Sequence, residues 1–276
     1  MAQRHHAEAV TAPPPGPARG AEEAAAPRDW DGATYDRIAD PMTRWGAEVL
    51  ARLELSGDEI VLDAGAGSGR VTEMLLERLP TGRAVAFDAA PSMLVEAHRR
   101  LARFEGRVRF VEGDLLDLSP ALLGTDSPVD AVLSTATFHW VLDHDRLFAN
   151  LAAVMRPGAV LAAQCGAAGN IANLVEAVRS TGTERAGQWC YATPEETRAR
   201  LERAGFDDIE VWTHPEPTRL EQGEELETYL ETVCLRTHVT GMSRHERARF
   251  LHQVAAAMAE PVIDYVRLNI SARRGP

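Results

Sequence analysis

Lysine is absent from this chain of 276 residues, so all 29 of its basic residues are arginines. The absence excludes a P-loop lysine and a lysine that forms a Schiff base with pyridoxal phosphate. Acidic residues outnumber basic ones by 41 to 29, which gives a formal net charge of −12. This balance argues against a broad basic surface for nucleic acid or for an anionic membrane. We therefore expect neither as a partner.

Cysteine and long apolar runs are also scarce. Cys165, Cys190 and Cys234 form neither a CxxC pair nor an even set for disulfides, so we expect reduced, buried thiols. No stretch reaches the roughly 18 consecutive apolar residues that a membrane helix needs. The first residues lack the apolar segment of a signal peptide. These absences predict a soluble, cytoplasmic protein.

The remaining composition is that of a globular domain, with 45% hydrophobic and 25% charged residues. Residues 1–28, rich in alanine and proline, are predicted to be a flexible tail, and residues 29–276 to form one domain. Apolar spacing predicts a helix at Tyr35–Ala39, interrupted at Pro41, and a second helix over residues 45–53.

Short apolar runs alternate with amphipathic helices from Ile60 onward. The expected strands are Ile60–Leu62, Ala84–Phe87, Val108–Val111, Val129–Ser134, Val160–Gln164, Ile209–Trp212 and Arg267–Ala272. One helix is expected between the glycine turn after the first strand and Leu79, and others over Met93–Phe104, Arg146–Met155 and Glu195–Ala204. A turn at Pro157-Gly158 is expected before the fifth strand. This alternation indicates an α/β fold with a parallel sheet and right-handed crossovers. A helical cap is predicted as an insertion at about residues 167–260, without a second core.

A glycine-rich loop, Asp63-Ala64-Gly65-Ala66-Gly67-Ser68-Gly69, follows the first strand directly and precedes a helix. Its glycines allow a sharp turn and close approach of a ligand. Dinucleotide binding needs G-x-G-x-x-G, but the third glycine position is occupied by Arg70, and Asp63 would repel a pyrophosphate. A carboxylate there suits S-adenosylmethionine, which carries an ammonium and a sulfonium. A nicotinamide-dependent oxidoreductase is the alternative from another class.

Two further acids follow the next two strands. Asp88 lies 19 residues after Gly69, close to the spacing of about 20 expected for an acid that binds ribose hydroxyls. Gly113-Asp114-Leu115 ends the third strand, where it can bond an adenine amino group and flank the ring. Open α/β sheets bind ligands at the carboxyl ends of their strands, so the three features predict one site.

These segments, together with Tyr35–Ala39, Phe138–His144 and Arg267–Arg274, resemble the class I S-adenosylmethionine-dependent methyltransferases. Within them, the chain is similar to the trans-aconitate methyltransferase group over roughly residues 30–274. The resemblance implies a Rossmann-like, seven-stranded, mostly parallel sheet with helices on both faces. It also implies that the final strand, near Leu268–Ala272, is antiparallel to the others.

The resemblance further assigns residues to the cofactor. It implies that Asp88 binds the ribose, that Asp114 and Leu115 bind the adenine, and that Ala89 and Met93 line the adenosine pocket. Arg44 would bind the carboxylate of the cofactor. The methionine end would contact Asp63, Ala64, Gly65, Gly67, Gly69, Thr135 and Ala136. Tyr35 would cap the cofactor from the N-terminal helix. Arg44 as a solvated helix residue and Tyr35 as ordinary packing are the structural alternatives.

Methyl transfer is an in-line displacement in which the cofactor supplies the electrophile, so the protein mainly aligns the reactants. His139, just after the fourth strand, is the candidate general base, and Tyr35 is the second candidate catalytic residue. The alternative for His139 is that it holds a helix in place through a backbone bond. Asp143-His144-Asp145 is predicted to cap a helix, and no metal is expected.

The substrate is a small molecule for which two interpretations compete. Aromatic side chains stabilise a carbocation by ~0.5–2 kcal/mol each, and Tyr35, Phe138, Trp140, Trp189 and Tyr191 could surround a hydrocarbon. Related enzymes methylate prenyl groups of natural products, so a terpenoid C-methyltransferase that triggers cyclisation is the preferred interpretation.

The alternative is O-methylation of a small carboxylic acid such as trans-aconitate, with Arg236 and Arg267 binding carboxylates; their structural alternative is a surface ion pair. The chain reads Cys234-Leu235-Arg236-Thr237 where that group tends to have Gly-Leu-Arg-Pro, which puts tricarboxylate specificity in doubt. A methyltransferase-like subunit that supports a partner, and a homo-oligomer in which the N-terminal helix contacts a neighbour, remain open.

Overall fold

The computed structural model describes residues 40–182 and 189–276. The predicted tail and the Tyr35–Ala39 helix lie outside these ranges. Within them, no helix has both the length and the apolar character needed to span a membrane.

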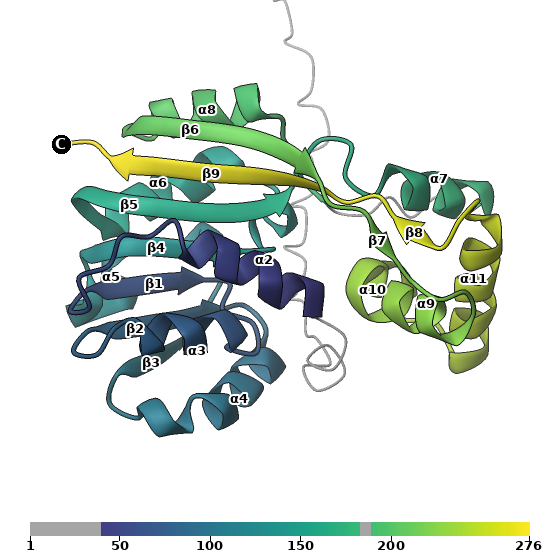
Figure 1. Ribbon diagram of the computed structural model, residues 1–276, viewed down its shortest axis with the longest axis horizontal. Helices are drawn as coiled ribbons and strands as arrows, with labels where there is room; N and C mark the ends of the chain where they lie inside the picture. Colours follow the sequence, from purple (N-terminus) through teal and green to yellow (C-terminus); the bar gives the residue numbers. More distant parts are fainter. Residues whose placement is uncertain (1–39, 183–188) are drawn as a thin grey trace, which may run out of the picture.

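A seven-stranded sheet forms the centre of the protein (Figure 1). Its strands are β1 (Ile60–Ala64), β2 (Arg83–Asp88), β3 (Val108–Glu112), β4 (Val129–Thr135), β5 (Met155–Gly166), β6 (Phe206–Pro215) and β9 (Val266–Arg274). They are ordered β3-β2-β1-β4-β5-β9-β6. β1 to β5 pair in parallel, whereas β9 is antiparallel to both β5 and β6. The α/β class and the antiparallel final strand are therefore confirmed.

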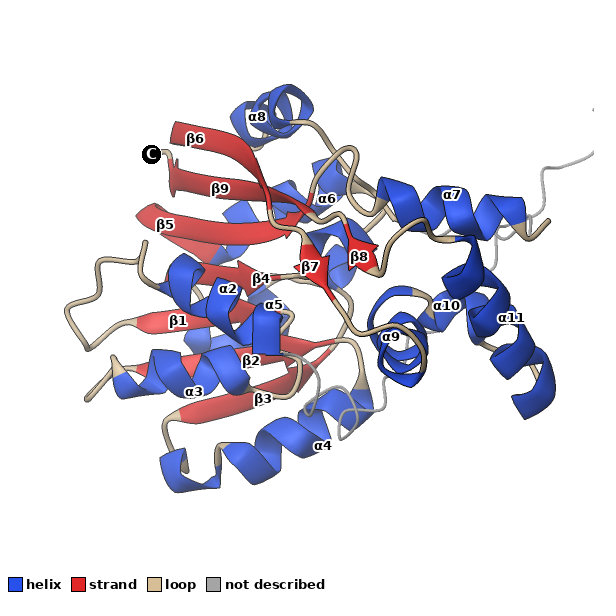
Figure 2. Ribbon diagram, turned by 45° about the vertical axis from the view of Figure 1, so that its right-hand side comes forward, coloured by secondary structure: helices blue, strands red, loops and turns tan. Residues whose placement is uncertain are grey.

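Helices cover both faces of the sheet (Figure 2). One face carries α2 (Asp40–Leu50), α3 (Arg70–Glu77) and α4 (Pro91–Arg100), and the other carries α5 (Pro120–Leu123), α6 (His144–Val154) and α8 (Pro194–Arg203). Successive side chains of a strand point to opposite faces, so Val61 packs in one hydrophobic cluster and Leu62 in the other. Helices cover both clusters, so the strands are buried on both faces. This explains why the buried strands are apolar throughout.

The fifth strand begins earlier than the sequence predicts. Pro157 and Gly158 lie inside β5, although a turn is predicted there. The register with β4 jumps from the pair Val129–Met155 to the pair Ala131–Val160, so the extra residues form an irregularity within the strand. Gly158 adopts φ +80°, which a glycine accommodates without steric cost. The strand therefore absorbs the turn instead of starting after it.

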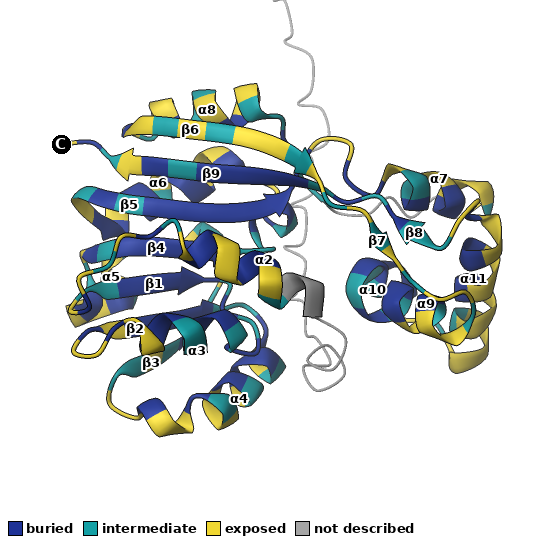
Figure 3. Ribbon diagram, in the orientation of Figure 1, coloured by how far each residue is buried: buried dark blue, intermediate teal, exposed yellow. Residues whose placement is uncertain are grey.

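A cap lies beyond the carboxyl ends of the parallel strands (Figure 1). It contains α7 (Ala172–Ser180), α9 (Glu224–Tyr229), a π-helical turn (Leu230–Cys234), α10 (Arg236–Val239), α11 (Arg244–Ala257) and the short pair β7 (Thr218–Arg219) and β8 (Val262–Ile263). Figure 3 shows buried residues where these helices face one another. Leu174, Leu230 and Val254, each 0% exposed, belong to their hydrophobic cluster.

Two features of the cap differ from the sequence-based expectation. The cap is not one insertion over 167–260, because α8 and β6 interrupt it and belong to the central sheet, where Leu201 and Phe206 are buried. It also has a hydrophobic cluster of its own, apart from the two clusters of the sheet, although no second core is predicted. This cluster forms because α9, α10 and α11 bury their apolar faces against one another and against α7.

Candidate cofactor and substrate site

Asp63 lies near the end of β1, between β2 and β4, and is 1% exposed. Thr72 of α3 donates a hydrogen bond from its hydroxyl to Oδ2 of Asp63 at 2.7 Å. The other carboxyl oxygen, Oδ1, is buried and has no hydrogen-bond partner within the described part of the chain. Burial raises the pKa of Asp63 to about 7, the Thr72 bond lowers it, and the charge of Asp88 raises it. A buried carboxyl with an unpartnered oxygen is suited to a cationic donor.

The glycines of the loop serve different steric needs. A Cβ on Gly65 would lie 2.0 Å from Oγ1 of Thr137, so only glycine fits beside the residue that follows β4. A Cβ on Gly69 would lie 3.2 Å from Cα of Ala97, which brings the loop against α4. A Cβ on Gly67, at φ +55°, would have no atom within 4 Å. Gly67 therefore borders open space, as a residue that faces a ligand does.

Asp88, at the end of β2, is held from two sides by backbone amides. The amide of Gly67 donates to Oδ2 at 2.8 Å, and the amide of Ala90 donates to Oδ1 at 2.8 Å. A carboxylate has about four acceptor sites, so each oxygen can still accept a bond from one hydroxyl of a ribose. Burial raises the pKa of Asp88, and the backbone bonds lower it. The neighbouring Ala89 is half-buried, and Met93 of α4 is buried.

Asp114 is exposed after β3, and its Oδ1 accepts a hydrogen bond from the amide of Leu116 at 2.8 Å. This bond caps the short 3₁₀ turn Leu115–Asp117 and leaves Oδ2 available to an amino group. The sequence predicts that Leu115 flanks the adenine ring, but its side chain is 5% exposed and belongs to the core of the sheet. The predicted acid is thus positioned for a ligand, whereas the leucine serves packing.

The carboxyl ends of β1 and β2 therefore meet the requirements of S-adenosylmethionine. Asp63 offers an unpartnered buried oxygen, Gly67 borders open space, and Asp88 retains acceptor sites. The first suits an ammonium and the last suits ribose hydroxyls.

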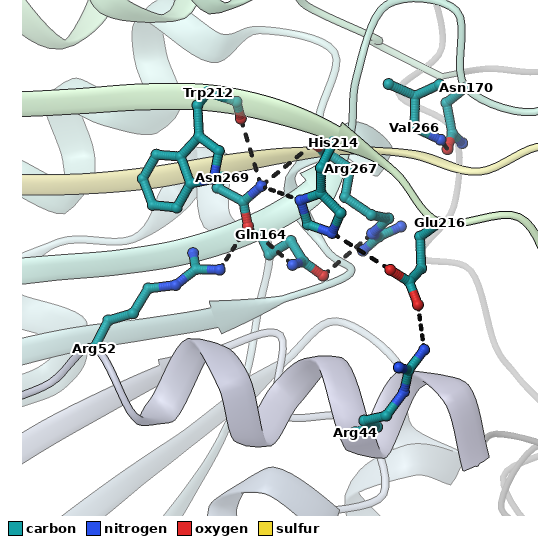
Figure 4. A network of polar contacts seen from close by, with 10 residues as sticks. All are labelled: Arg44, Arg52, Gln164, Asn170, Trp212, His214, Glu216, Val266, Arg267 and Asn269. Atoms are coloured by element: carbon teal, nitrogen blue, oxygen red, sulfur yellow. Dashed lines mark hydrogen bonds and ion pairs between the residues drawn. The ribbon is translucent and has the colours of Figure 1, made fainter.

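Arg44 has an ion-pair partner within the protein. Its guanidinium forms an ion pair with Glu216, which follows β6 (Figure 4), and its side chain is 61% exposed. The pKa of Glu216 is lowered, because the hydrogen bond from Arg44 and its charge outweigh the partial burial of the carboxyl. A carboxylate of the protein thus occupies this arginine, and it links α2 to the segment that leads into the cap.

The end of β4 and the residues that follow it lie beside the glycine loop. Thr135 and Ala136 are half-buried, and the amide of Ala136 donates to the carbonyl of Gln164 at 2.7 Å. Ala136 adopts φ +55°, a conformation uncommon for a residue with a Cβ. The contact between Thr137 and Gly65 brings this segment next to the loop, so its predicted role at the methionine end stays a prediction.

His139 and Phe138 point into different surroundings. The amide of Gly166, at the end of β5, donates to Nδ1 of His139 at 3.2 Å, and His139 is 8% exposed. Phe138 is predicted to contact substrate, but it is 1% exposed and packs edge-on against Phe148 of α6 with ring centroids 5.9 Å apart. Because the 3₁₀ turn sends consecutive side chains in different directions, Phe138 belongs to the core of the sheet, whereas His139 contacts the end of β5.

Three of the predicted aromatic residues gather beneath the cap. The rings of Trp189 and Tyr191 stack at 5.6 Å with an interplanar angle of 17°, and Trp140 lies 6.2 Å from Trp189. His238 of α10, which sequence reasoning missed, lies 5.4 Å from Trp189. Burial raises the pKa of the Tyr191 hydroxyl, although its bond with Asn170 opposes the shift. Tyr35 lies outside the described residues.

Arg267, at the start of β9, pairs with Gly166 across the sheet and is 3% exposed. Its Nε donates to Oε1 of Gln164 at 3.2 Å (Figure 4). Its guanidinium lies 4.5 Å from the centre of the Trp45 ring. The alternative of a surface ion pair is therefore wrong for Arg267. Arg236 of α10 differs: it is half-buried and its side chain forms no hydrogen bond or ion pair with any residue that the structure describes.

Sequence reasoning also missed the buried amide Asn269, which connects several elements (Figure 4). Its Oδ1 accepts from Arg52 at 2.6 Å and from Gln164 at 2.9 Å, and its Nδ2 lies 2.9 Å from Nδ1 of His214. The only signal was polarity, since an asparagine interrupts the apolar run of the final strand. In contrast, Asp143 caps α6 as predicted, accepting from the amide of Arg146 at 2.9 Å.

Known proteins are similar to this chain in sequence and fold. A family model described as a methyltransferase domain matches residues 61–158. The trans-aconitate 2-methyltransferase of Methylobacterium nodulans is 29% identical over 268 residues, which cover 89% of this chain and 98% of that protein. The enzyme of the same name from Acidovorax ebreus is 38% identical over 136 residues, 49% of each chain. Phosphoethanolamine N-methyltransferase 2 of Haemonchus contortus, solved with S-adenosyl-L-methionine, has a similar fold with a TM-score of 0.58 at 18% identity, over 89% of this chain and 56% of that one.

The glycine loop, the two acids and these matches support a class I S-adenosylmethionine-dependent methyltransferase. S-adenosylmethionine is its cofactor, and the nicotinamide alternative is not supported. Within the class, the chain is similar to trans-aconitate 2-methyltransferases along most of its length.

Proposed function

We propose that this enzyme methylates a carboxylate oxygen of a small organic acid. The observation that carries the proposal is the half-buried Arg236 side chain, which has no ion-pair or hydrogen-bond partner among the described residues. A partly desolvated guanidinium without a partner is unfavourable, and a carboxylate can satisfy it with two parallel hydrogen bonds.

The residue after Arg236 supports the same ligand chemistry. Oγ1 of Thr237 is buried and likewise has no hydrogen-bond partner in the described part of the chain. Buried hydroxyls are rarely left without a partner, so a polar ligand is a natural occupant. These two side chains begin α10, the segment in which this chain departs from the Gly-Leu-Arg-Pro pattern. The proposal is therefore the class of small carboxylic acids, of which trans-aconitate is one member.

The relatives support this choice. The Methylobacterium nodulans protein, whose name includes trans-aconitate, aligns over 98% of its length, so the similarity includes the cap as well as the cofactor domain. The cofactor, when bound, supplies an electrophilic methyl group, and an ionised carboxylate attacks it without a general base. Asp63 and Asp88 would hold the cofactor, and the cap would present the acid to it.

A second candidate is C-methylation of an isoprenoid chain. The stacked rings of Trp189 and Tyr191, with Trp140 beside them, are the specific observation in its favour, because aromatic faces stabilise a carbocation. Nevertheless, a hydrocarbon substrate would leave Arg236 and Thr237 without partners. We therefore prefer the carboxylic acid.

Methyl-labelled cofactor tests the choice directly. The enzyme is incubated with trans-aconitate, with other di- and tricarboxylic acids, and separately with isoprenoid-bearing acceptors. Label that is released by mild base indicates an ester and supports the proposal. Label retained on a carbon that resists base would contradict it.

A matched pair of variants tests the role of Arg236. Arg236→Gln should raise KM for the acid at least tenfold and leave cofactor affinity within threefold. Arg249→Gln, which removes an exposed arginine of α11, should change neither value. Equal effects of the two variants would exclude Arg236 as the carboxylate-binding residue.

A further inference from the structure

Two segments of the chain run side by side from the sheet into the cap: the residues after β6 and those before β9 (Figure 1). They are joined where they leave the sheet, because the amide of Glu216 donates to the carbonyl of Tyr265 at 2.8 Å. We call these two residues the neck. The hydroxyl of Tyr265 lies 2.9 Å from that of Tyr229 in α9 and 3.5 Å from Sγ of Cys234 in the π-helical turn. The neck therefore contacts the segment that leads into Arg236.

The helix α2 contacts both residues of the neck. Arg44 forms its ion pair with Glu216 (Figure 4). The ring of Trp45 packs edge-on against Tyr265, with ring centroids 5.2 Å apart and an interplanar angle of 75°. Trp45 is 2% exposed and belongs to the hydrophobic cluster of the cap, whereas Val49 of the same helix belongs to a cluster of the sheet. One helix is thus buried in both parts of the protein.

The same helix also contacts the start of α3, which follows Gly69 of the cofactor loop directly. Nη1 of Arg70 donates to Oγ1 of Thr43 at 3.0 Å. A Cβ on Gly46 would lie 2.4 Å from Cγ2 of Val71, so the two helices are in close contact at this point. α2 therefore connects the helix that begins at the cofactor loop to the neck of the cap.

We infer that Arg44 and Trp45 are positioning residues, which hold the cap, and with it Arg236, at a fixed place relative to the cofactor loop. The inference rests on the proposed function for the role of Arg236. Methyl transfer needs the reacting atoms about 3–3.5 Å apart in line, and a displacement of about 1 Å can cost roughly 100-fold in rate. In this role neither residue contacts the reacting atoms.

Charge reversal tests the ion pair. In Arg44→Glu two carboxylates face each other, and the double variant Arg44→Glu/Glu216→Arg exchanges the charges and restores a pair. Because exposed ion pairs are weak, we expect a modest loss in kcat of Arg44→Glu, at least threefold. The acceptor is the one found with methyl-labelled cofactor. Glu216 also lies 3.6 Å from Nε2 of His214, so the double variant should recover most of kcat and not all of it.

Cofactor affinity separates this role from the predicted one. Kd for S-adenosylmethionine, measured by calorimetry, should change less than threefold in both variants. A tenfold loss in Arg44→Glu that the double variant does not recover would show that Arg44 binds the cofactor, and it would overturn the inference. An unchanged kcat, or a loss in kcat that the double variant does not recover, would overturn it as well.

A matched ion pair on α8 provides the control. Arg203 pairs with Asp145, and its side chain is 59% exposed, compared with 61% for Arg44. This pair joins two helices that both cover the sheet, so Arg203→Glu should leave kcat unchanged. Equal losses in Arg203→Glu and Arg44→Glu would show a general effect of charge and would overturn the inference.

Hydrogen exchange tests the position of the cap without any acceptor. With cofactor bound to the full chain, the protection factor of the amide at position 216 reports its bond to Tyr265. It should fall at least threefold in Arg44→Glu, recover in the double variant and stay unchanged in Arg203→Glu. An unchanged protection factor in Arg44→Glu would overturn the inference. Since no acid is needed, the result also distinguishes a failure of this inference from a failure of the proposed function.

Variants of Trp45 test the aromatic contact. Trp45→Phe keeps a ring beside Tyr265 and should retain at least half of kcat. Trp45→Ala should lose at least tenfold in kcat, with Kd for the cofactor changed less than threefold. Full kcat in Trp45→Ala would overturn the inference. If that variant does not fold, the charge reversal and the hydrogen exchange still decide.

Discussion

Replacement of Asp63 by asparagine should raise the thermal stability of the cofactor-free protein and weaken cofactor binding. The pKa of Asp63, about 7, lies roughly three units above the ordinary value of 3.8. At about 1.36 kcal/mol per unit, ionisation of this carboxyl in the folded protein costs on the order of 4 kcal/mol more than in the unfolded chain. Because the folded pKa is raised, stability declines as the pH increases from about 4 to 7 and is then constant.

Asparagine keeps an oxygen for the Thr72 hydroxyl but cannot ionise. Its buried amide N–H atoms cost about 1–3 kcal/mol if they have no acceptor. At pH 8 we therefore expect Asp63→Asn to raise Tm of the cofactor-free protein by roughly 3–10 °C, at about 2–4 °C per kcal/mol for a domain of this size. At pH 5, where the wild-type carboxyl is protonated, the rise should disappear. Thermal unfolding at both pH values measures this.

Cofactor binding should respond in the opposite direction. Loss of a charge-assisted hydrogen bond costs about 2–4 kcal/mol, or roughly 30- to 700-fold in Kd. Wild-type affinity should fall by up to about tenfold per pH unit below pH 7, because binding an ammonium requires the ionised carboxylate, and this dependence should vanish in the variant. Titration calorimetry of both, with Asp58→Asn at an exposed position two residues before the same strand as control, tests the reasoning. Equal affinities, or equal pH slopes, would refute it.

Other variants test further parts of the site. Asp88→Asn should weaken cofactor binding by roughly 10- to 100-fold in calorimetry, about 1.5–3 kcal/mol, because hydrogen bonds to a charged acceptor are lost; an unchanged Kd would place the ribose elsewhere. Gly65→Ala should lower Tm by several degrees, because its Cβ would meet Thr137 at 2.0 Å. Gly67→Ala, whose Cβ would have no atom within 4 Å, should lose about 1 kcal/mol of stability. It should also lose most of the rise in Tm that the cofactor induces. Asn269→Ala should destabilise the protein by about 2–4 kcal/mol in denaturant unfolding, because it leaves buried donors without an acceptor; a loss below 1 kcal/mol would show that the network is not structural.

The parts of the fold that sequence predicted are those in which one local pattern decides the structure. The strands of the sheet are short apolar runs bounded by glycine or polar residues, and both faces are buried, so their positions follow from composition. The glycine loop with Asp63 and Asp88 follows a fixed spacing along one βαβ unit. For these elements, the residues that favour the local structure are also those that the whole fold needs, so the local pattern is enough to predict them.

The features that sequence did not predict depend on contacts between distant segments. The partner of Arg44 is Glu216, 172 residues away, and no spacing rule connects them. Phe138 and His139 are neighbours in sequence, and only the three-dimensional turn decides which one enters the core. The cap was predicted to be helical but not to have its own hydrophobic cluster. Periodicity shows that a helix has an apolar face, but it does not show which other element packs against that face.

The position of β9 between β5 and β6 ties the two halves of the protein together during folding. β6 joins the sheet only through β9, and the residues between these two strands, 216–265, build most of the cap. β6 and β9 therefore pair only when the chain between them returns to the sheet. The free-energy cost of closing such a loop grows by only about 0.6 kcal/mol for each doubling of its length. Evolution can enlarge, shorten or reshape the excursion at little thermodynamic cost, provided that its apolar faces still cover one another. A single cofactor scaffold can in this way acquire new acceptors without being rebuilt.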